Sequence, residues 1–139
     1  MGTISKKLII IFYGILLLSC REKVHDKLCN DLLKNKNEIK LKELTNFEWD
    51  TLYIIRGLMI QKQIERIIKT STKIESIGEE QIAFVFLKDN KEAYTEIEDF
   101  HSNCLIESHD VSYGNCDTLQ VKKVSYNSGA IYLLRHEKW

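Results

Sequence analysis

The run Phe47–Ile55 restricts the folding of this chain more than any other stretch. Its alternate positions are Phe47, Trp49, Thr51, Tyr53 and Ile55. Residues two apart on a strand share a face, so this set predicts one apolar face. On the other face, acidic residues at 48 and 50 give way to apolar residues at 52 and 54. The run therefore predicts a strand that starts with one wet face and ends buried on both, as inside a sheet.

Other stretches supply the remaining elements of the fold. Strand patterns cover Ile82–Leu87, Glu92–Glu98, Leu119–Tyr126 and Ala130–Arg135, and helical spacing covers Val24–Leu33 and Leu58–Lys69. The last two strands flank Asn127-Ser128-Gly129, a strong hairpin signal. The sequence therefore predicts an α+β fold, with two helices packed on one face of a largely antiparallel sheet of about five strands.

The start of the chain has the layout of an export signal. Lys6 and Lys7 precede the apolar run Leu8–Leu18, and Ser19-Cys20 closes it. A charged region, an apolar region and a small-residue cleavage site occur in that order in secretory signals. The run is too short for a stable transmembrane helix, which needs about 20 residues. We therefore expect residues 1–19 to be removed.

The residues Leu17-Leu18-Ser19-Cys20 resemble the lipobox of bacterial lipoproteins. The resemblance implies that the Cys20 thiol receives a diacylglyceryl group, and that the new amino end is acylated with a chain such as palmitate. It also implies an envelope location. Arg21 is not the aspartate that retains enterobacterial lipoproteins in the inner membrane, which favours the outer membrane in a Gram-negative host. Residues 20–23 then form a short tether, and 24–139 a single α+β domain.

The charge balance excludes one class of partner. Removing residues 1–19 removes Lys6 and Lys7 from the 20 basic residues and none of the 20 acidic ones, which leaves a formal charge of −2. Nucleic-acid binding needs a basic surface, so we expect no nucleic-acid partner.

Three cysteines remain besides Cys20. Cys104 and Cys116 lie in the polar stretch Phe100–Thr118, and an oxidising compartment favours a disulfide between them. Closing a loop of that size contributes about 3 kcal/mol in the chain-entropy model. Cys29 lies in a helical pattern and is interpreted as a small buried apolar residue. Pairing of Cys29 with either loop cysteine remains an alternative.

The same loop also carries the ligand types of a zinc site. His101, Cys104, His109 and Cys116 could surround a tetrahedral ion, but their spacing is not that of a zinc finger. Oxidation would compete for both thiols, so we predict the disulfide and no metal. Cofactor motifs such as glycine-rich phosphate loops are absent from the sequence.

A second resemblance concerns the central strand. Phe47-Glu48-Trp49-Asp50-Thr51-Leu52-Tyr53-Ile54 resembles the F-x-W-D-x-(L/V)-Y-I signature of small uncharacterised bacterial lipoproteins. In that group the signature strand is followed by a helix and an apolar strand, and here Ile60–Lys69 and Ala83–Asn90 occupy those places. The resemblance implies a shared fold and compartment, and it implies no activity.

Acidic residues on two predicted strands form a candidate binding surface. Glu48 and Asp50 share a face of one strand, and Tyr94, Glu96 and Glu98 share a face of another. The alternative is that Trp49 anchors the core and Asp50 orders the backbone or the preceding turn, while the glutamates only solvate a sheet face. A basic partner would fit the surface if it is free.

We find no catalytic set in the sequence. His109-Asp110 is a pair of sequence neighbours, which seldom reach the geometry of a base with its orienting carboxylate. The hypothesis is a lipid-anchored, non-enzymatic binding or inhibitory module, for example an immunity protein. The alternatives are an envelope structural or assembly component, and a small-ligand-binding protein or enzyme with its site in residues 100–118.

Overall fold

The protein is described here by a computed structural model covering residues 22–100, 104–127 and 129–137. Its helices are α2 (Val24–Leu33), α3 (Gln61–Ile68) and the short 3₁₀ helix η1 (Leu41–Glu43). Its strands are β1 (Glu38–Lys40), β2 (Thr51–Arg56), β3 (Met59–Ile60), β4 (Ser76–Ile77), β5 (Gln81–Lys88), β6 (Lys91–Asp99), β7 (Leu105–Ser108), β8 (Tyr113–Gly114), β9 (Thr118–Tyr126) and β10 (Gly129–Arg135). The α+β class is confirmed, but the expectation of one sheet of about five strands is wrong.

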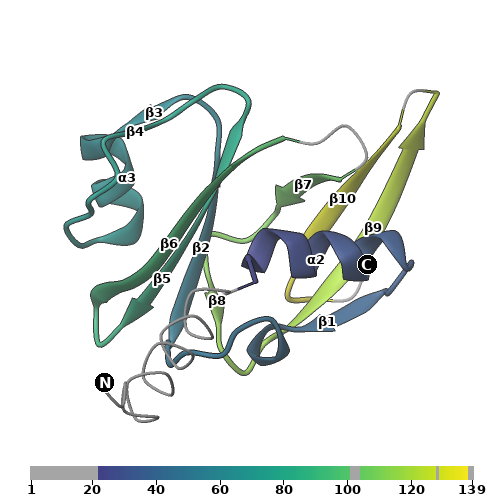
Figure 1. Ribbon diagram of the computed structural model, residues 1–139, viewed down its shortest axis with the longest axis horizontal. Coiled ribbons are helices and arrows are strands. Elements are labelled where there is room, and N and C mark those ends of the chain that lie inside the picture. The colour runs from purple at the N-terminus through teal and green to yellow at the C-terminus, as the bar shows by residue number, and fades with distance from the viewer. Residues whose placement is uncertain (1–21, 101–103, 128, 138–139) are drawn as a thin grey trace, which may run out of the picture.

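The strands form two four-stranded sheets and one small ribbon. The first sheet has the order β6-β5-β2-β8 and is antiparallel, and the second has the order β1-β9-β10-β7 with one parallel pair, β10 with β7. Strands β3 and β4 pair only with each other. Figure 1 shows the two four-stranded sheets side by side, with α3 and the β3–β4 ribbon beyond the first sheet. None of the helices in the described residues is long and apolar enough to cross a bilayer.

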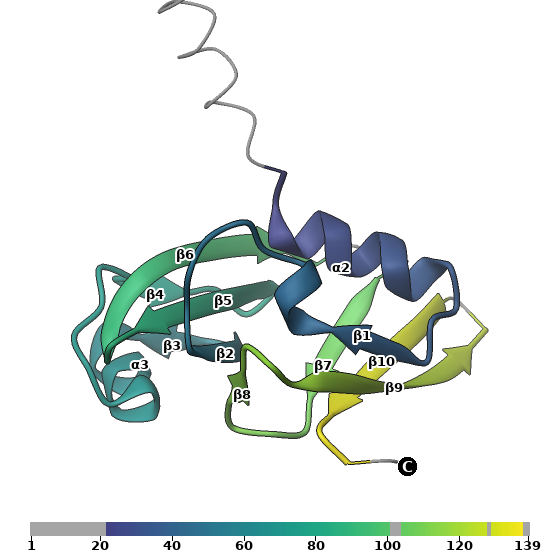
Figure 2. The same ribbon diagram turned by 90° about the horizontal axis from the view of Figure 1, so that it is seen from below.

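The central strands β2 and β5 are buried on both faces because each face packs on a different core. On one face Leu52, Ile54 and the even-numbered residues of β5 join α2 and the second sheet. On the other face Tyr53, Ile55 and the odd-numbered residues of β5 pack on α3. The two helices therefore lie on opposite faces of the first sheet (Figure 2), and the prediction of both on one face is wrong.

The segment before β2 differs from the predicted strand. β2 begins at Thr51, so Trp49 does not share a face with Tyr53 and instead packs in the core with Leu52. Trp49 is 2% exposed, and its indole N–H donates to Thr45 Oγ1 at 2.8 Å. This bond four residues back holds the chain in a loop, which the alternation of polar and apolar residues could not reveal.

The other elements fall close to their predicted positions. The helix Val24–Leu33 has the predicted bounds, and the hairpin of β9 and β10 pairs in register from Tyr126 with Gly129 to Gln120 with Arg135. The turn between β5 and β6 has positive φ at both Asp89 and Asn90, as a tight hairpin turn requires. The polar stretch Phe100–Thr118, for which no strand was predicted, supplies β7 to the second sheet and β8 to the first.

Candidate functional site

The predicted acidic surface on β6 is in fact a docking point for helix α2. Glu96 is buried, at 6% exposure, and its carboxylate accepts the backbone N–H groups of Val24 at 2.9 Å and His25 at 2.8 Å. Tyr94 donates its hydroxyl to the same carboxylate at 2.9 Å. The first N–H groups of a helix have no partner within the helix, and a carboxylate also favours the helix dipole there. Glu96 therefore does not belong to an open binding surface.

Glu98 completes this docking point. The Lys23 ammonium lies 2.6 Å from Glu98 Oε1, and this hydrogen bond and charge raise the pKa of Lys23 above its ordinary value. A basic partner was the hypothesis for this strand face, and the cation found there is the lysine that precedes α2. The start of the described chain is thus fixed to β6.

Asp50 and Glu48 lie apart from that docking point. Asp50 Oδ2 accepts the N–H of Asp89 at 2.9 Å, and its own N–H donates to the Leu87 carbonyl at 2.9 Å. Asp50 therefore orders a turn, as the alternative interpretation held, although it is the β5–β6 turn and not the preceding one. Glu48 is exposed beside Trp49 on the rim of a shallow pocket.

The predicted disulfide between Cys104 and Cys116 is wrong. Cys104 is bonded to Cys29 of α2, with 5.8 Å between their Cα atoms, and Cys116 is an exposed free thiol. The reason is topological: Cys104 directly precedes β7 in the second sheet, whereas Cys116 follows β8 in the first. Closeness in sequence therefore did not bring the two sulfurs together, and the alternative pairing left open for Cys29 is the one found.

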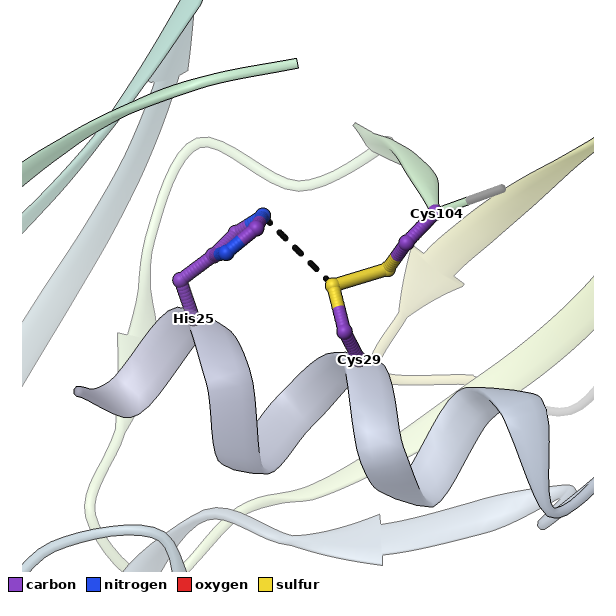
Figure 3. A group of neighbouring side chains, drawn as sticks. All are labelled: His25, Cys29 and Cys104. Carbon is purple, nitrogen blue, oxygen red and sulfur yellow. Dashed lines mark hydrogen bonds between the residues drawn. A yellow bond between two sulfur atoms is a disulfide. The ribbon is translucent and has the colours of Figure 1, made fainter. Parts of the chain in front are cut away.

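The four residues weighed as an alternative zinc site are not gathered either. His101 lies outside the described residues, His109 is exposed, and the two thiols are separated by their sheets. Within the described part of the chain, a different group holds three potential metal ligands close together: His25, Cys29 and Cys104, whose ligand atoms all lie within 4.8 Å of one another. Figure 3 shows the imidazole turned toward the disulfide.

This His25–disulfide site lies on the floor of an open pocket. The pocket has a volume of about 530 Å³ and is lined by both cysteines, His25, Asp26 and Asn30, among others. His25 Nε2 lies 3.5 Å from Cys29 Sγ, and His25 Nδ1 lies 3.6 Å from Asp26 Oδ1. Because positions four apart on a helix share a face, the spacing of His25 and Cys29 is the signal that could have revealed the site.

A second histidine is held between two carboxylates at the other end of the chain. His136 Nε2 lies 2.7 Å from Asp117 Oδ2, and Nδ1 lies 3.1 Å from Asp110 Oδ2. The Tyr113 ring lies against this imidazole at 4.8 Å between centroids. A carboxylate therefore faces each ring nitrogen, and these contacts join the end of β10 to the loops on either side of β8.

A groove separates the end of β2 from β7. It has a volume of about 690 Å³, with Arg56, Gly57 and Met59 on one wall and Glu107, Ser108 and Val111 on the other. β8 pairs with β2 only at Thr51 and Leu52, so in the described residues the rest of β2 lacks a strand partner on that side. β7 is likewise the last strand of its sheet. The groove is therefore flanked by two open strand edges.

Apolar side chains line this groove, and one of them, Val111, is largely exposed. Val111 is 74% exposed and lines the groove. Leu58 and Ile60, at 75% and 58%, are sequence neighbours of the lining residue Met59 but are not among the residues that line it. A groove lined by partly exposed apolar residues such as Met59, Ile67 and Val111 is typical of a protein contact surface.

Comparison of the chain with known protein families, with curated proteins and with solved structures found no match.

Proposed function

We propose that this chain is a lipid-anchored protein of the bacterial envelope that binds a protein partner and has no catalytic activity of its own. The anchor is the acylated Cys20, and the favoured location is the outer membrane of a Gram-negative host. The diacylglyceryl group and the acyl chain on the amino end would together make the attachment stable, because a single chain gives only marginal binding.

The groove between β2 and β7 carries the binding part of this proposal. Open strand edges can accept an added strand, whose main chain supplies affinity while pockets for alternate side chains supply selectivity. The groove offers such edges together with the apolar side chains of Met59, Ile67 and Val111. Arg56 and Glu107 on opposite walls provide charges that would orient an occupant.

The occupant we propose is an extended, apolar segment of another envelope protein. An inhibitory or immunity role would follow if that segment belongs to a toxin, and an assembly role if it belongs to a permanent envelope component. The two roles differ in the identity of the partner and share the same surface.

Site-specific photo-crosslinking in the native host tests the groove. A crosslinker at position 59 or 111, both of which line the groove, should capture one defined partner, whereas one at the exposed Tyr126 should not. The purified partner should then bind the protein, and Val111→Asp should weaken that binding at least tenfold, while Tyr126→Asp leaves it unchanged. Equal capture at all three positions would contradict the proposal.

The anchor is tested independently. Cys20→Ala should abolish labelling by a fatty-acid analogue and release the protein from the membrane fraction. Labelling that persists in this variant would overturn the lipoprotein assignment without affecting the groove.

A further inference from the structure

We propose that the Cys29–Cys104 disulfide is a reducible element which, once opened, becomes a zinc site together with His25. This inference does not depend on the groove or on its partner. It rests on the placement of three ligand atoms, on the carboxylate behind the imidazole, and on the pocket above the disulfide.

The spacing of nitrogen and sulfur fits a shared metal ion. Zinc binds imidazole nitrogen at about 2.0–2.1 Å and thiolate sulfur at about 2.3 Å in tetrahedral sites, which places the two ligand atoms about 3.6 Å apart. His25 Nε2 lies 3.5 Å from Cys29 Sγ. This pair is therefore already at ligand separation, and only the Cys104 sulfur has to swing away when the bond breaks.

The other nitrogen of His25, Nδ1, is buried and has a carboxylate nearby, at a distance longer than a hydrogen bond. Asp26 Oδ1 lies 3.6 Å from Nδ1. A carboxylate behind a ligating imidazole retains the proton on that nitrogen and directs the lone pair of Nε2 toward the metal. Here Nε2 is the nitrogen that faces Cys29. Because His25 is 1% exposed and packs against Phe84, its ring orientation is fixed by the core.

The pocket supplies access and a fourth coordination position. Cys29 and Cys104 are 8% and 2% exposed, yet both line the pocket of about 530 Å³ at the start of α2. A site with two cysteines and one histidine leaves a fourth position for water or a small ligand, as in open zinc sites. Asp26 and Glu22 at the pocket wall add negative charge that favours entry of a cation.

The chemistry balances with a dithiol as reductant. Two electrons and two protons pass from the dithiol to the protein, so that the Cys29–Cys104 bond breaks, each sulfur takes one proton, and the reductant closes its own disulfide. Zn²⁺ then displaces both thiol protons to solvent and binds the two thiolates and Nε2. The oxidised protein cannot form this site, because its sulfurs are bonded to each other.

Cobalt binding tests the proposal in the full chain. In a Cys20→Ser, Cys116→Ser background, Cys29 and Cys104 are the only cysteines. After reduction with a phosphine and its removal, one equivalent of Co²⁺ should give thiolate charge-transfer absorption and the visible bands of tetrahedral cobalt, and Zn²⁺ should displace it. The oxidised protein should give neither signal.

Three variants separate a zinc site from unspecific thiolate binding. His25→Gln should weaken Zn²⁺ binding by about 100-fold or more, and Asp26→Asn, which changes an exposed side chain, by about tenfold. His109→Gln, on the exposed loop after β7, is the control and should bind as the parent does. Equal binding by all three variants, binding by the oxidised protein, or no stoichiometric binding after reduction would each overturn the proposal. If reduction unfolds the chain, recovery of the fold with one equivalent of Zn²⁺ supports the site and failure to recover contradicts it.

Discussion

At the scale of single residues, Trp49 carries much of the packing in the larger core. Its ring contacts Phe86 edge to face at 5.1 Å between centroids, and its carbonyl accepts a hydrogen bond from the Asn115 side chain at 2.8 Å. It therefore connects the loop before β2, strand β5 and the loop after β8.

Trp49→Ala should lower the free energy of unfolding by about 3–5 kcal/mol, because truncation of a buried aromatic residue leaves a cavity. Urea denaturation followed by circular dichroism measures the change. Tyr126→Ala removes a ring that is 54% exposed, and this control should change stability by no more than about 0.5 kcal/mol. Equal effects of the two substitutions would place Trp49 at the surface.

Tyr113 makes the stability of the protein depend on pH in alkaline solution. Its hydroxyl donates to the Leu134 carbonyl at 3.1 Å and contacts Ser108 Oγ at 2.6 Å. Burial raises the pKa of Tyr113 above its ordinary value of 10.0, and the Asp110 charge adds to this, against the opposing effect of the Ser108 bond. Between about pH 10 and the folded-state pKa, the folded protein retains the phenolic proton and the unfolded chain loses it.

The free energy of unfolding should therefore fall as the pH rises above about 10, since proton release favours the unfolded chain. Tyr113→Phe should remove this decrease of the unfolding free energy with pH. At neutral pH the substitution should lower the unfolding free energy by about 1 kcal/mol, because a hydrogen bond is lost. Urea midpoints measured from neutral pH to about pH 11 test both effects. Tyr126→Phe, an exposed tyrosine, should retain the parent slope; loss of the slope in this control would exclude Tyr113 as its source.

At the scale of elements, the start of α2 depends on a carboxylate from another element. Lys23, at its N-cap, makes no side-chain capping bond, and Glu96 of β6 accepts the N–H groups of Val24 and His25 instead. The helix is thus capped across 72 residues of sequence, which replaces the local serine, threonine or aspartate that usually does so.

Glu96→Ala should cost about 3 kcal/mol, because two buried N–H groups lose their acceptor. Hydrogen exchange should show the amides of α2 losing protection before those of β5. Glu96→Gln retains one acceptor oxygen and should cost less. The exposed Glu79→Ala is the matched control and should leave exchange unchanged. Uniform loss of protection along the whole chain in Glu96→Ala would contradict a local capping role.

Elements with a complete local signal could be predicted from the sequence. α2, the β5–β6 hairpin and the β9–β10 hairpin have their own periodicity and turn residues, and they are found at the expected places. β7 and β8 could not be predicted, because four and two residues are too few to show a period and each is defined by its pairing partner. The role of Glu96 could not be predicted for a similar reason. An acidic residue on a strand is expected to be exposed, and the helix that covers Glu96 is distant in the sequence.

At the scale of the whole molecule, the Cys29–Cys104 bond joins α2 to the second sheet. Because β7 and β8 belong to different sheets, the disulfide joins a different pair of cysteines from the pair that the sequence predicted. Disulfide partners follow topology, and no local pattern encodes whether two neighbouring strands enter one sheet or two.

Replacing both Cys29 and Cys104 by alanine should lower the free energy of unfolding by about 4 kcal/mol, because the bond closes a loop of 75 residues. Non-reducing peptide mapping should recover the Cys29–Cys104 peptide pair from the parent. Cys116→Ser, at an exposed free thiol, is the control and should leave stability unchanged. Recovery of a Cys104–Cys116 pair would refute this connectivity.

The salt bridge between Lys23 and Glu98 limits how far this body can stand from a bilayer. Only two residues separate the proposed lipid-modified cysteine at position 20 from that lysine. Three residues of fully extended chain span about 10 Å. With the proposed lipid on Cys20, a tether this short would hold the domain against the lipid headgroups, with the start of α2 nearest to them. A partner that binds in the groove would then have to lie close to the membrane surface. A flexible spacer inserted after residue 21 would let the protein bind partners farther from the membrane.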